Sequence, residues 1–144
     1  MNDNLYPKAD FFLFETTDSN GDYVVFTVNA AYKNYEYKED YPWCLSILVD
    51  IESLEGYPTF EEAELLDQLE DEISDRLIQV CNCHHIVRIT TKGARQIVFY
   101  LDDPKQANEL LNELVDNPNS SRQWEYDMRE DYNWENVEYF LSGL

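Results

Sequence analysis

The segment IVRITTKGARQIVFYLDDP, residues 86–104, contains the pattern that decides the fold. Two runs rich in β-branched and aromatic residues, 86–91 and 96–101, flank Lys92-Gly93, which is typical of a tight turn between antiparallel strands. Asp103 suits the N-cap of a helix, and Pro104 suits its first position. The segment therefore predicts a strand, a turn, a second strand and the start of a helix.

The residues before this segment predict a strand followed by a long helix. Apolar side chains alternate with other residues from Trp43 to Ile51, which is the period of a strand with one buried face. Thr59 suits an N-cap, and Glu62 three residues later completes a capping box. From Phe60 to Cys81, apolar residues recur at helical spacing.

The residues after the segment predict a helix, a strand and a short closing helix. An apolar stripe runs from Ala107 to Val115 at helical spacing. A strand is expected from about Arg122 to Met128, and Asn133 is expected to cap a helix over 134–141. From residue 42 the order is β-α-β-β-α-β, which predicts an α+β, ferredoxin-like arrangement with helices on one face of an antiparallel sheet.

The chain of 144 residues is expected to form a single domain, residues 1–144. Residues 11–41 would form an N-terminal β-hairpin, turning at Asn20-Gly21, and a tyrosine-rich connector. Residues 42–130 would form the ferredoxin-like core, and residues 131–144 the C-terminal helix. The hairpin lies outside the core and is expected to extend one edge of the sheet. Pairing of that edge strand in a dimer is one alternative, and the sequence does not predict the oligomeric state.

The charge is strongly acidic, because 30 acidic residues face 10 basic ones and give a net charge of −20. Such a chain would repel nucleic acid and anionic membranes, so a basic protein is the expected partner. A second interpretation, that acidity only maintains solubility, stays open. We expect a cytoplasmic location, because the start of the sequence lacks an apolar leader and no stretch could span a bilayer. The three cysteines, an odd number, also argue against a disulfide framework and suit a reducing compartment.

The outer face of the 59–81 helix is the candidate partner-binding surface. Like charges three or four residues apart cost an exposed helix roughly 0.2–0.5 kcal/mol per pair, so one interpretation is that the face is kept acidic for a basic partner. Alternatively, salt screens the repulsion and nothing binds. The candidate residues are Glu61, Glu64, Asp71, Glu72 and Asp75.

The stretch QVCNCHH, residues 79–85, raises the question of a metal or redox site. Cysteine and histidine bind zinc, but Cys81 continues the apolar helix face, and Asn82 suits the left-handed residue that ends a helix. The spacing is C-x-C rather than C-x-x-C, so a helix end leading into a strand is the favoured interpretation. We predict no metal and no cofactor.

Aromatic residues are concentrated in and around the connector. They suit either a protein contact or a cover for the open face of the sheet. The set is Tyr32, Tyr35, Tyr37, Tyr41, Trp43, Trp134 and Tyr139.

No catalytic centre is evident in the sequence. It lacks a G-x-S-x-G elbow and a Walker glycine loop. We therefore do not expect an enzyme, and predict an acidic protein-binding module that regulates or inhibits a basic partner, such as a nucleic-acid enzyme or a toxin. The alternative is an enzyme of unknown reaction that uses carboxylates, or a metal, together with the histidines.

The run from Tyr41-Pro42-Trp43 through RITTKGARQIVFYLDDP, and the tail RQWEYDMREDYNWENVEYFL, resemble a bacterial family of unknown function, DUF695. The likeness lies in a threonine at Thr90 or Thr91, then Gly93, Arg95 and the aromatic pair Phe99-Tyr100, and it covers about residues 22–142. The resemblance implies a ferredoxin-like α+β fold. It also implies kinship of fold with the small acidic regulator B proteins that bind and inhibit ribonuclease E. It carries over no catalytic residue.

Overall fold

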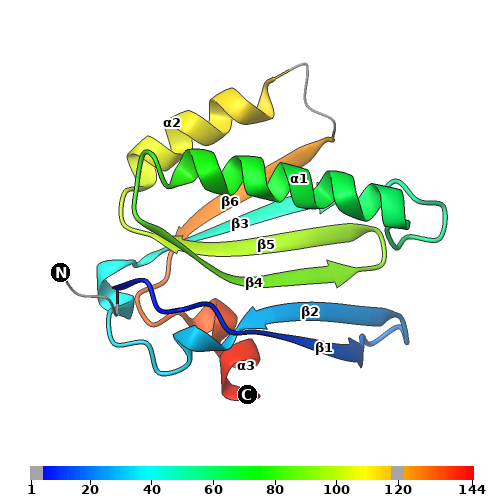
Figure 1. Cartoon of the computed structure of the whole chain (residues 1–144), viewed down its shortest axis with the longest axis horizontal. Coiled ribbons are helices and arrows are strands. Elements are labelled where there is room, and N and C mark those ends of the chain that lie inside the picture. The colour runs from blue at the N-terminus through cyan, green and yellow to red at the C-terminus, as the bar shows by residue number, and fades with distance from the viewer. Residues whose placement is uncertain (1–4, 118–121) are drawn as a thin grey trace.

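The computed structural model describes residues 5–117 and 122–144, which form a mixed α/β domain (Figure 1). Its elements follow one another in the predicted order from residue 11 to the closing helix. They are β1 (Phe11–Thr17), β2 (Tyr23–Asn29), β3 (Trp43–Asp50), α1 (Phe60–Leu77), β4 (Cys83–Thr91), β5 (Ala94–Leu101), α2 (Pro104–Val115), β6 (Trp124–Glu130) and α3 (Glu135–Ser142).

The strands form one six-stranded sheet in the order β1-β2-β4-β5-β3-β6, and every neighbouring pair is antiparallel. The antiparallel sheet is as predicted, but its order differs from that of a four-stranded ferredoxin-like sheet, because β1 and β2 continue it beyond β4. The N-terminal hairpin is therefore an integral part of the sheet. Gly93, at φ 95°, makes the predicted turn between β4 and β5.

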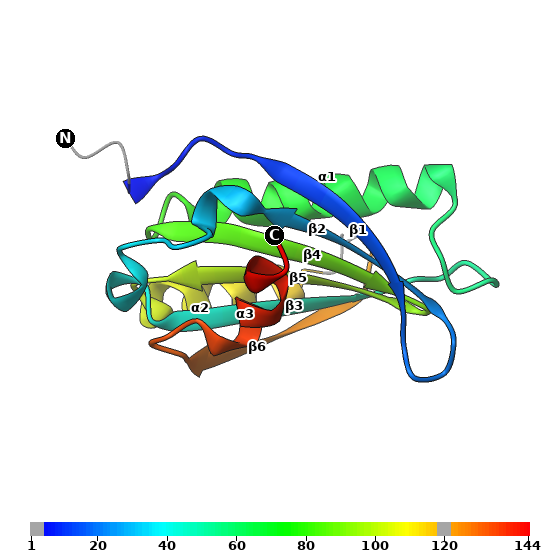
Figure 2. The ribbon, with the colours of Figure 1, turned by 90° about the horizontal axis from the view of Figure 1, so that it is seen from below.

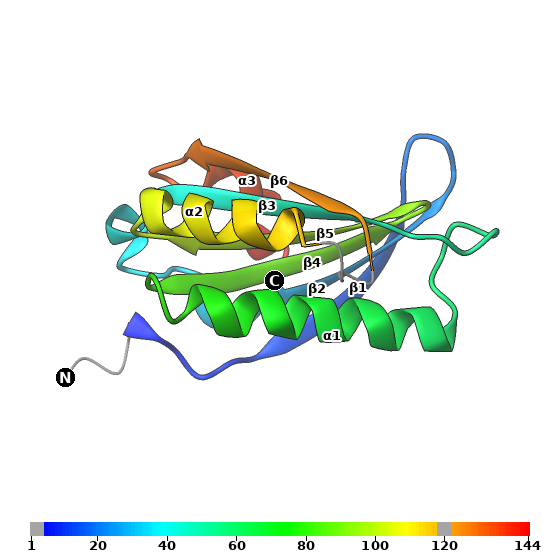
Figure 3. The same cartoon turned by 90° about the horizontal axis from the view of Figure 1, so that it is seen from above.

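Helices cover both faces of the sheet. The two long helices, α1 and α2, lie together on one face, as Figure 3 shows from above. The short helix α3 lies on the opposite face, which Figure 2 shows from below. Because both faces are covered, the inner strands bury side chains in both directions.

Two hydrophobic cores result from this arrangement. The core beneath α1 and α2 contains Leu45, Ile47 and Phe99, together with the apolar stripes of the two helices. The core beneath α3 contains Tyr100 and Trp134, which stack with their ring centroids 4.3 Å apart. Consecutive residues of one strand, such as Phe99 and Tyr100, therefore belong to different cores.

The tyrosine-rich connector covers the α3 face of the sheet, which was one of the two interpretations of its sequence. Tyr32, Tyr35 and Tyr41 are buried in the core beneath α3. Short 3-10 helices at Ala30–Tyr32 and Lys38–Asp40 carry the chain across this face. Tyr139, in contrast, is 69% exposed.

Three predictions of local structure require correction. Asn133 does not cap α3, because the carboxylate of Asp131 accepts hydrogen bonds from the backbone N–H groups of Glu135 and Asn136, at 3.0 Å each. Asn82 does not adopt a left-handed conformation. The capping box of α1 is only half formed: Thr59 accepts from the N–H of Glu62 at 3.1 Å, but the Glu62 carboxylate turns instead to the chain before the helix.

Among the described residues, no helix is both long enough and apolar enough to cross a membrane.

Candidate protein-binding surface

Helix α1 presents one buried and one acidic side. Its buried stripe contains Leu66, Leu69, Ile73 and Leu77, spaced three or four residues apart, which fixes the orientation of the helix on the sheet. The opposite side, here called the acidic face, contains all five predicted residues, and each is exposed. They are Glu61, Glu64, Asp71, Glu72 and Asp75.

Two arginines of the sheet hold α1 in place. Arg88 of β4 donates two hydrogen bonds to the buried carboxylate of Glu70, one of them of 2.9 Å from Nε to Oε1. Arg95 of β5 pairs with Asp67 at 3.1 Å. Burial opposes the ionisation of Glu70, but the hydrogen bonds and charge of Arg88 outweigh it, and the pKa of Glu70 is lowered. These pairs fix the helix from its inner side.

A third arginine anchors the start of α1. Arg122, which is buried, pairs with Glu62 at 2.9 Å and also with Glu52. Glu62 accepts in addition from the backbone N–H groups of Glu52 and Ser53. The sequence pattern placed Arg122 in a strand and gave no signal for this pairing, because the two carboxylates lie 60 or more residues away in the chain.

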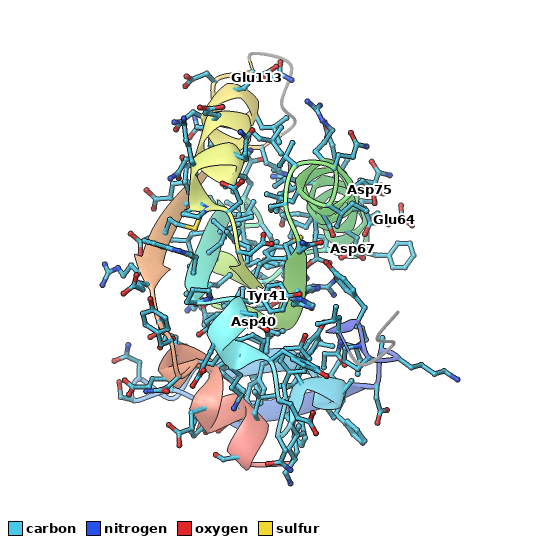
Figure 4. The ribbon with its side chains drawn as sticks, turned by 90° about the vertical axis from the view of Figure 1, so that its left-hand side faces the viewer. Asp40, Tyr41, Glu64, Asp67, Asp75 and Glu113 are labelled. Atoms are coloured by element: carbon cyan, nitrogen blue, oxygen red, sulfur yellow. The ribbon has the colours of Figure 1, made fainter. Side chains whose placement is uncertain are left out.

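The inward arginines leave the acidic face with little compensating charge, because Arg76 is the single basic residue within α1. Three of the ten basic residues of the chain are committed to the pairs beneath α1. Within residues 5–117 and 122–144, none of the five carboxylates of the acidic face forms an ion pair with a basic side chain. In Figure 4, Glu64 and Asp75 lie on the outer side of α1, and Asp67 lies nearer the sheet.

Helix α2 adds further negative charge to the same side of the sheet. Glu109 and Glu113 are exposed and lie four residues apart on α2. Figure 4 shows Glu113 on α2, which lies beside α1 on the same face of the sheet. Helix α2 is therefore acidic as well, although the sequence analysis singled out only the α1 residues for partner binding.

The two histidines of the QVCNCHH stretch lie on opposite faces of the sheet. His84 accepts or donates a hydrogen bond at Nδ1 with the Tyr32 hydroxyl, at 2.7 Å, in the core beneath α3. His85 packs against Phe99 of the other core, with ring centroids 5.0 Å apart. The two rings therefore do not converge on one ligand, and among the described residues no group of three or more metal-binding side chains is assembled.

Aromatic rings enclose His84. Tyr6 stacks on it at 4.5 Å between ring centroids, and Tyr41 meets it edge-on at 4.2 Å. Burial lowers the pKa of His84 to about 4, so the ring is neutral at physiological pH. Burial also raises the pKa of Tyr6 to about 12. The surroundings suit a structural histidine that packs as a neutral ring.

The three cysteines are free thiols. Cys81 donates from Sγ to the carbonyl oxygen of Leu77 at 3.4 Å, as expected of a residue at a helix end. Cys44 borders a hollow of about 320 Å³ beneath α3, beside Ser46 and Asn136. Burial raises the pKa of the Cys44 thiol, which leaves it protonated and a poor nucleophile.

Fold and surface together define an acidic α+β domain that exposes unpaired carboxylates on its helical side. A sequence model described as a family of unknown function (DUF695) matches residues 13–142, so the chain belongs to that family. The match begins earlier than the resemblance noted above and includes most of β1. Searches of curated proteins and of solved structures gave no match.

Proposed function

We propose that this protein is an acidic protein-binding module that regulates or inhibits a basic partner, such as a nucleic-acid enzyme or a toxin. The observation that carries the proposal is the acidic face, where five exposed carboxylates lie on one helix and form no ion pair with the basic side chains of the described residues. A rigid helix that bears unpaired charge keeps its potential directed outward, which speeds encounter with a complementary surface.

The sign of the charge limits the class of partner. A net charge of −20 repels phosphate backbones and anionic lipid headgroups, so nucleic acid and membranes are unsuitable. A protein that itself binds nucleic acid presents a basic surface of the complementary sign. This supports a cytoplasmic regulator that competes for such a surface.

The fold supports the same proposal by analogy. We infer that the four strands β4-β5-β3-β6, with α1 and α2, form a ferredoxin-like unit to which β1 and β2 have been added. The regulator B proteins that bind and inhibit ribonuclease E are small, acidic and similar in expected fold. Similarity of fold is only an analogy for function, so the binding function has to be demonstrated by experiment.

The test compares two charge-reversed variants of the immobilised protein in capture from a lysate of the source organism. Asp71→Lys with Asp75→Lys reverses the acidic face of α1. Glu109→Lys with Glu113→Lys makes the same change at the same spacing on α2 and serves as the matched control. We expect a basic protein that is retained at low salt, released at high salt, lost by the α1 variant and kept by the control.

The two variants also define the contrary result. Equal capture by both would show that net charge alone drives retention, and would remove the acidic face of α1 from the proposal. Capture of no protein at either salt concentration would contradict the binding function itself.

A further inference from the structure

Strand β1 is an edge strand with apolar side chains that face solvent. It stands at one end of the sheet order and pairs along its whole length with β2. Phe11 is 48% exposed, Phe12 is 47% exposed and Leu13 is 64% exposed. The outer edge of such a strand offers backbone N–H and C=O groups at alternate residues to any chain that lies beside it.

The opposite edge of the sheet differs in character. Strand β6 has Glu125, Asp127, Arg129 and Glu130 among its seven residues, and all four are exposed or partly exposed. Charged side chains on an edge are a common protection against unwanted pairing. The first four residues of β1, Phe11 to Phe14, have no such protection, which makes β1 the edge that is available for pairing.

The two faces of β1 have different surroundings. Leu13 pairs in register with Thr27, which in turn pairs with Arg88, the residue that holds Glu70 of α1. Phe11, Leu13 and Glu15 therefore lie on the side of the sheet that α1 covers. The alternate residues of β1, which include Phe14, lie on the side of α3.

A hollow lies on the α3 side of β1. It has a volume of about 300 Å³ and is lined by β1, β2 and the end of α3. Phe14 and Phe26 stack at its wall with ring centroids 5.5 Å apart, and Phe140 meets Phe26 edge-on at 5.1 Å. The size and the aromatic wall suit one apolar side chain of a neighbouring strand.

Charge around β1 indicates the sign of what would pair with it. Asp10 precedes the strand, Glu15 lies within it, and Asp18 follows it, and all three are exposed. A second copy of this chain would bring another net charge of −20 to the same edge, so self-pairing is opposed. A basic segment is attracted.

From this edge, hollow and charge we propose that β1 accepts an extended segment of a basic partner as a seventh strand of the sheet. The apolar side chains of that segment would face the α3 side, with one of them in the hollow between Phe14 and Phe140. Its lysine or arginine side chains would face the α1 side, where their stems cover Phe11 and Leu13 and their charges approach the carboxylates of α1. The inference rests on the proposed function and specifies how the basic partner is held.

The test uses a fluorescent peptide, KVKFKVK with blocked ends, whose anisotropy reports binding to the whole protein at low salt. Two further peptides have N-methyl groups, one at the valines and phenylalanine and the other at the inner lysines. Alternate N–H groups of a strand point to opposite edges, so only one of these peptides loses the bonds to β1. We expect it to bind at least about tenfold more weakly than KVKFKVK, while the other retains its affinity.

Protein variants identify the edge that is used. Leu13→Lys puts a positive charge on β1 and should weaken binding of KVKFKVK at least about tenfold. Leu54→Lys makes the same change at a fully exposed loop residue and should leave binding unchanged. Both side chains are largely exposed, so neither variant should unfold.

Several results would overturn the inference. They include failure of KVKFKVK to bind, equal binding by all three peptides, and a dimer of the protein alone that Leu13→Lys dissociates. A further contrary result is that Leu13→Lys leaves peptide binding intact while Asp71→Lys with Asp75→Lys abolishes it. That result would overturn pairing at β1 and keep the acidic face as the binding surface. The proposed function is judged separately, by salt-dependent capture of a basic protein.

Discussion

Individual buried charges decide how α1 sits on the sheet. Glu70 is 6% exposed, and Arg88 bonds both of its carboxylate oxygens. A buried carboxylate without its partner is costly, because water no longer solvates it. In the sequence, Glu70 is one of many acids of α1, and only its position opposite Arg88 distinguishes it.

The variant Glu70→Gln should therefore destabilise the protein. It keeps the shape of the side chain but leaves Arg88 without its main counter-charge, and Asp67, at 3.8 Å, compensates only in part. We expect the free energy of unfolding to fall by about 2–3 kcal/mol. Chemical denaturation measures the change, and Glu72→Gln on the exposed side should change it by less than about 0.5 kcal/mol. Equal effects of the two variants would contradict the role given to Glu70.

His84 should make stability depend on pH. Burial holds its pKa at about 4, below the value of about 6.5 for an unfolded histidine, so protonation favours the unfolded chain. The stabilisation is complete above about pH 6.5 and is lost as the pH falls toward 4. We expect the unfolding free energy to fall by about 2 kcal/mol between about pH 7 and pH 5 through this residue alone.

Denaturation of the variant His84→Phe at the same two pH values isolates this contribution. In the variant, the fall in unfolding free energy between about pH 7 and pH 5 should be about 2 kcal/mol smaller than in the unmodified protein, because phenylalanine has no proton to gain. His85, whose pKa burial also lowers, stays in place and accounts for a remaining slope. An unchanged slope in the variant would show that His84 titrates with a nearly ordinary pKa.

At the scale of elements, the short helix α3 depends on a few polar contacts at its start. The carboxylate of Asp131 accepts the Tyr100 hydroxyl at 2.6 Å as well as the two N–H groups of the first turn. Burial acts against ionisation of Asp131, but these hydrogen bonds outweigh it, and the pKa of Asp131 is lowered. Trp134 donates from Nε1 to the carbonyl oxygen of Tyr41 at 2.9 Å. These bonds join α3 to β5 and to the connector.

Asp131→Ala should release α3 from the sheet. The variant removes the N-terminal hydrogen bonds of the helix and leaves the Tyr100 hydroxyl without its acceptor, which should cost about 2 kcal/mol. Because Trp134 is 1% exposed, its fluorescence should shift to longer wavelength if α3 detaches. Asp127→Ala, which loses only an exposed pair with Arg129, is the control and should change neither measurement.

At the scale of the whole molecule, net charge opposes compaction. Twenty uncompensated negative charges repel one another in the folded chain more than in the expanded unfolded chain. Salt screens this repulsion, so the midpoint of thermal unfolding should rise with sodium chloride over the range in which the Debye length falls from about 30 Å to about 8 Å. Asp71→Asn with Asp75→Asn should show a smaller rise, and an equal or larger rise would contradict strong repulsion at the acidic face.

Sequence reasoning located most elements but few of the contacts between them. The turn at Gly93, the caps at Thr59 and Asp103, and the exposed positions of α1 follow from rules of local geometry, and the structure confirms them. The inward pairing of Glu62 with Arg122 connects residues 60 positions apart. No local pattern distinguishes those two side chains from others of the same charge.

The sequence by itself determined the order of elements, the acidity of the surface and the apolar stripe that turns α1 inward, because period and charge are properties of the chain. Only the tertiary structure decided which strands lie at the edges, on which face α3 packs and which acids face arginines. Those features depend on contacts between segments far apart in the sequence. Such contacts form only when the whole chain buries its apolar residues and pairs its strands. The exposed edge of β1 and the unpaired acidic face are both consequences of that choice.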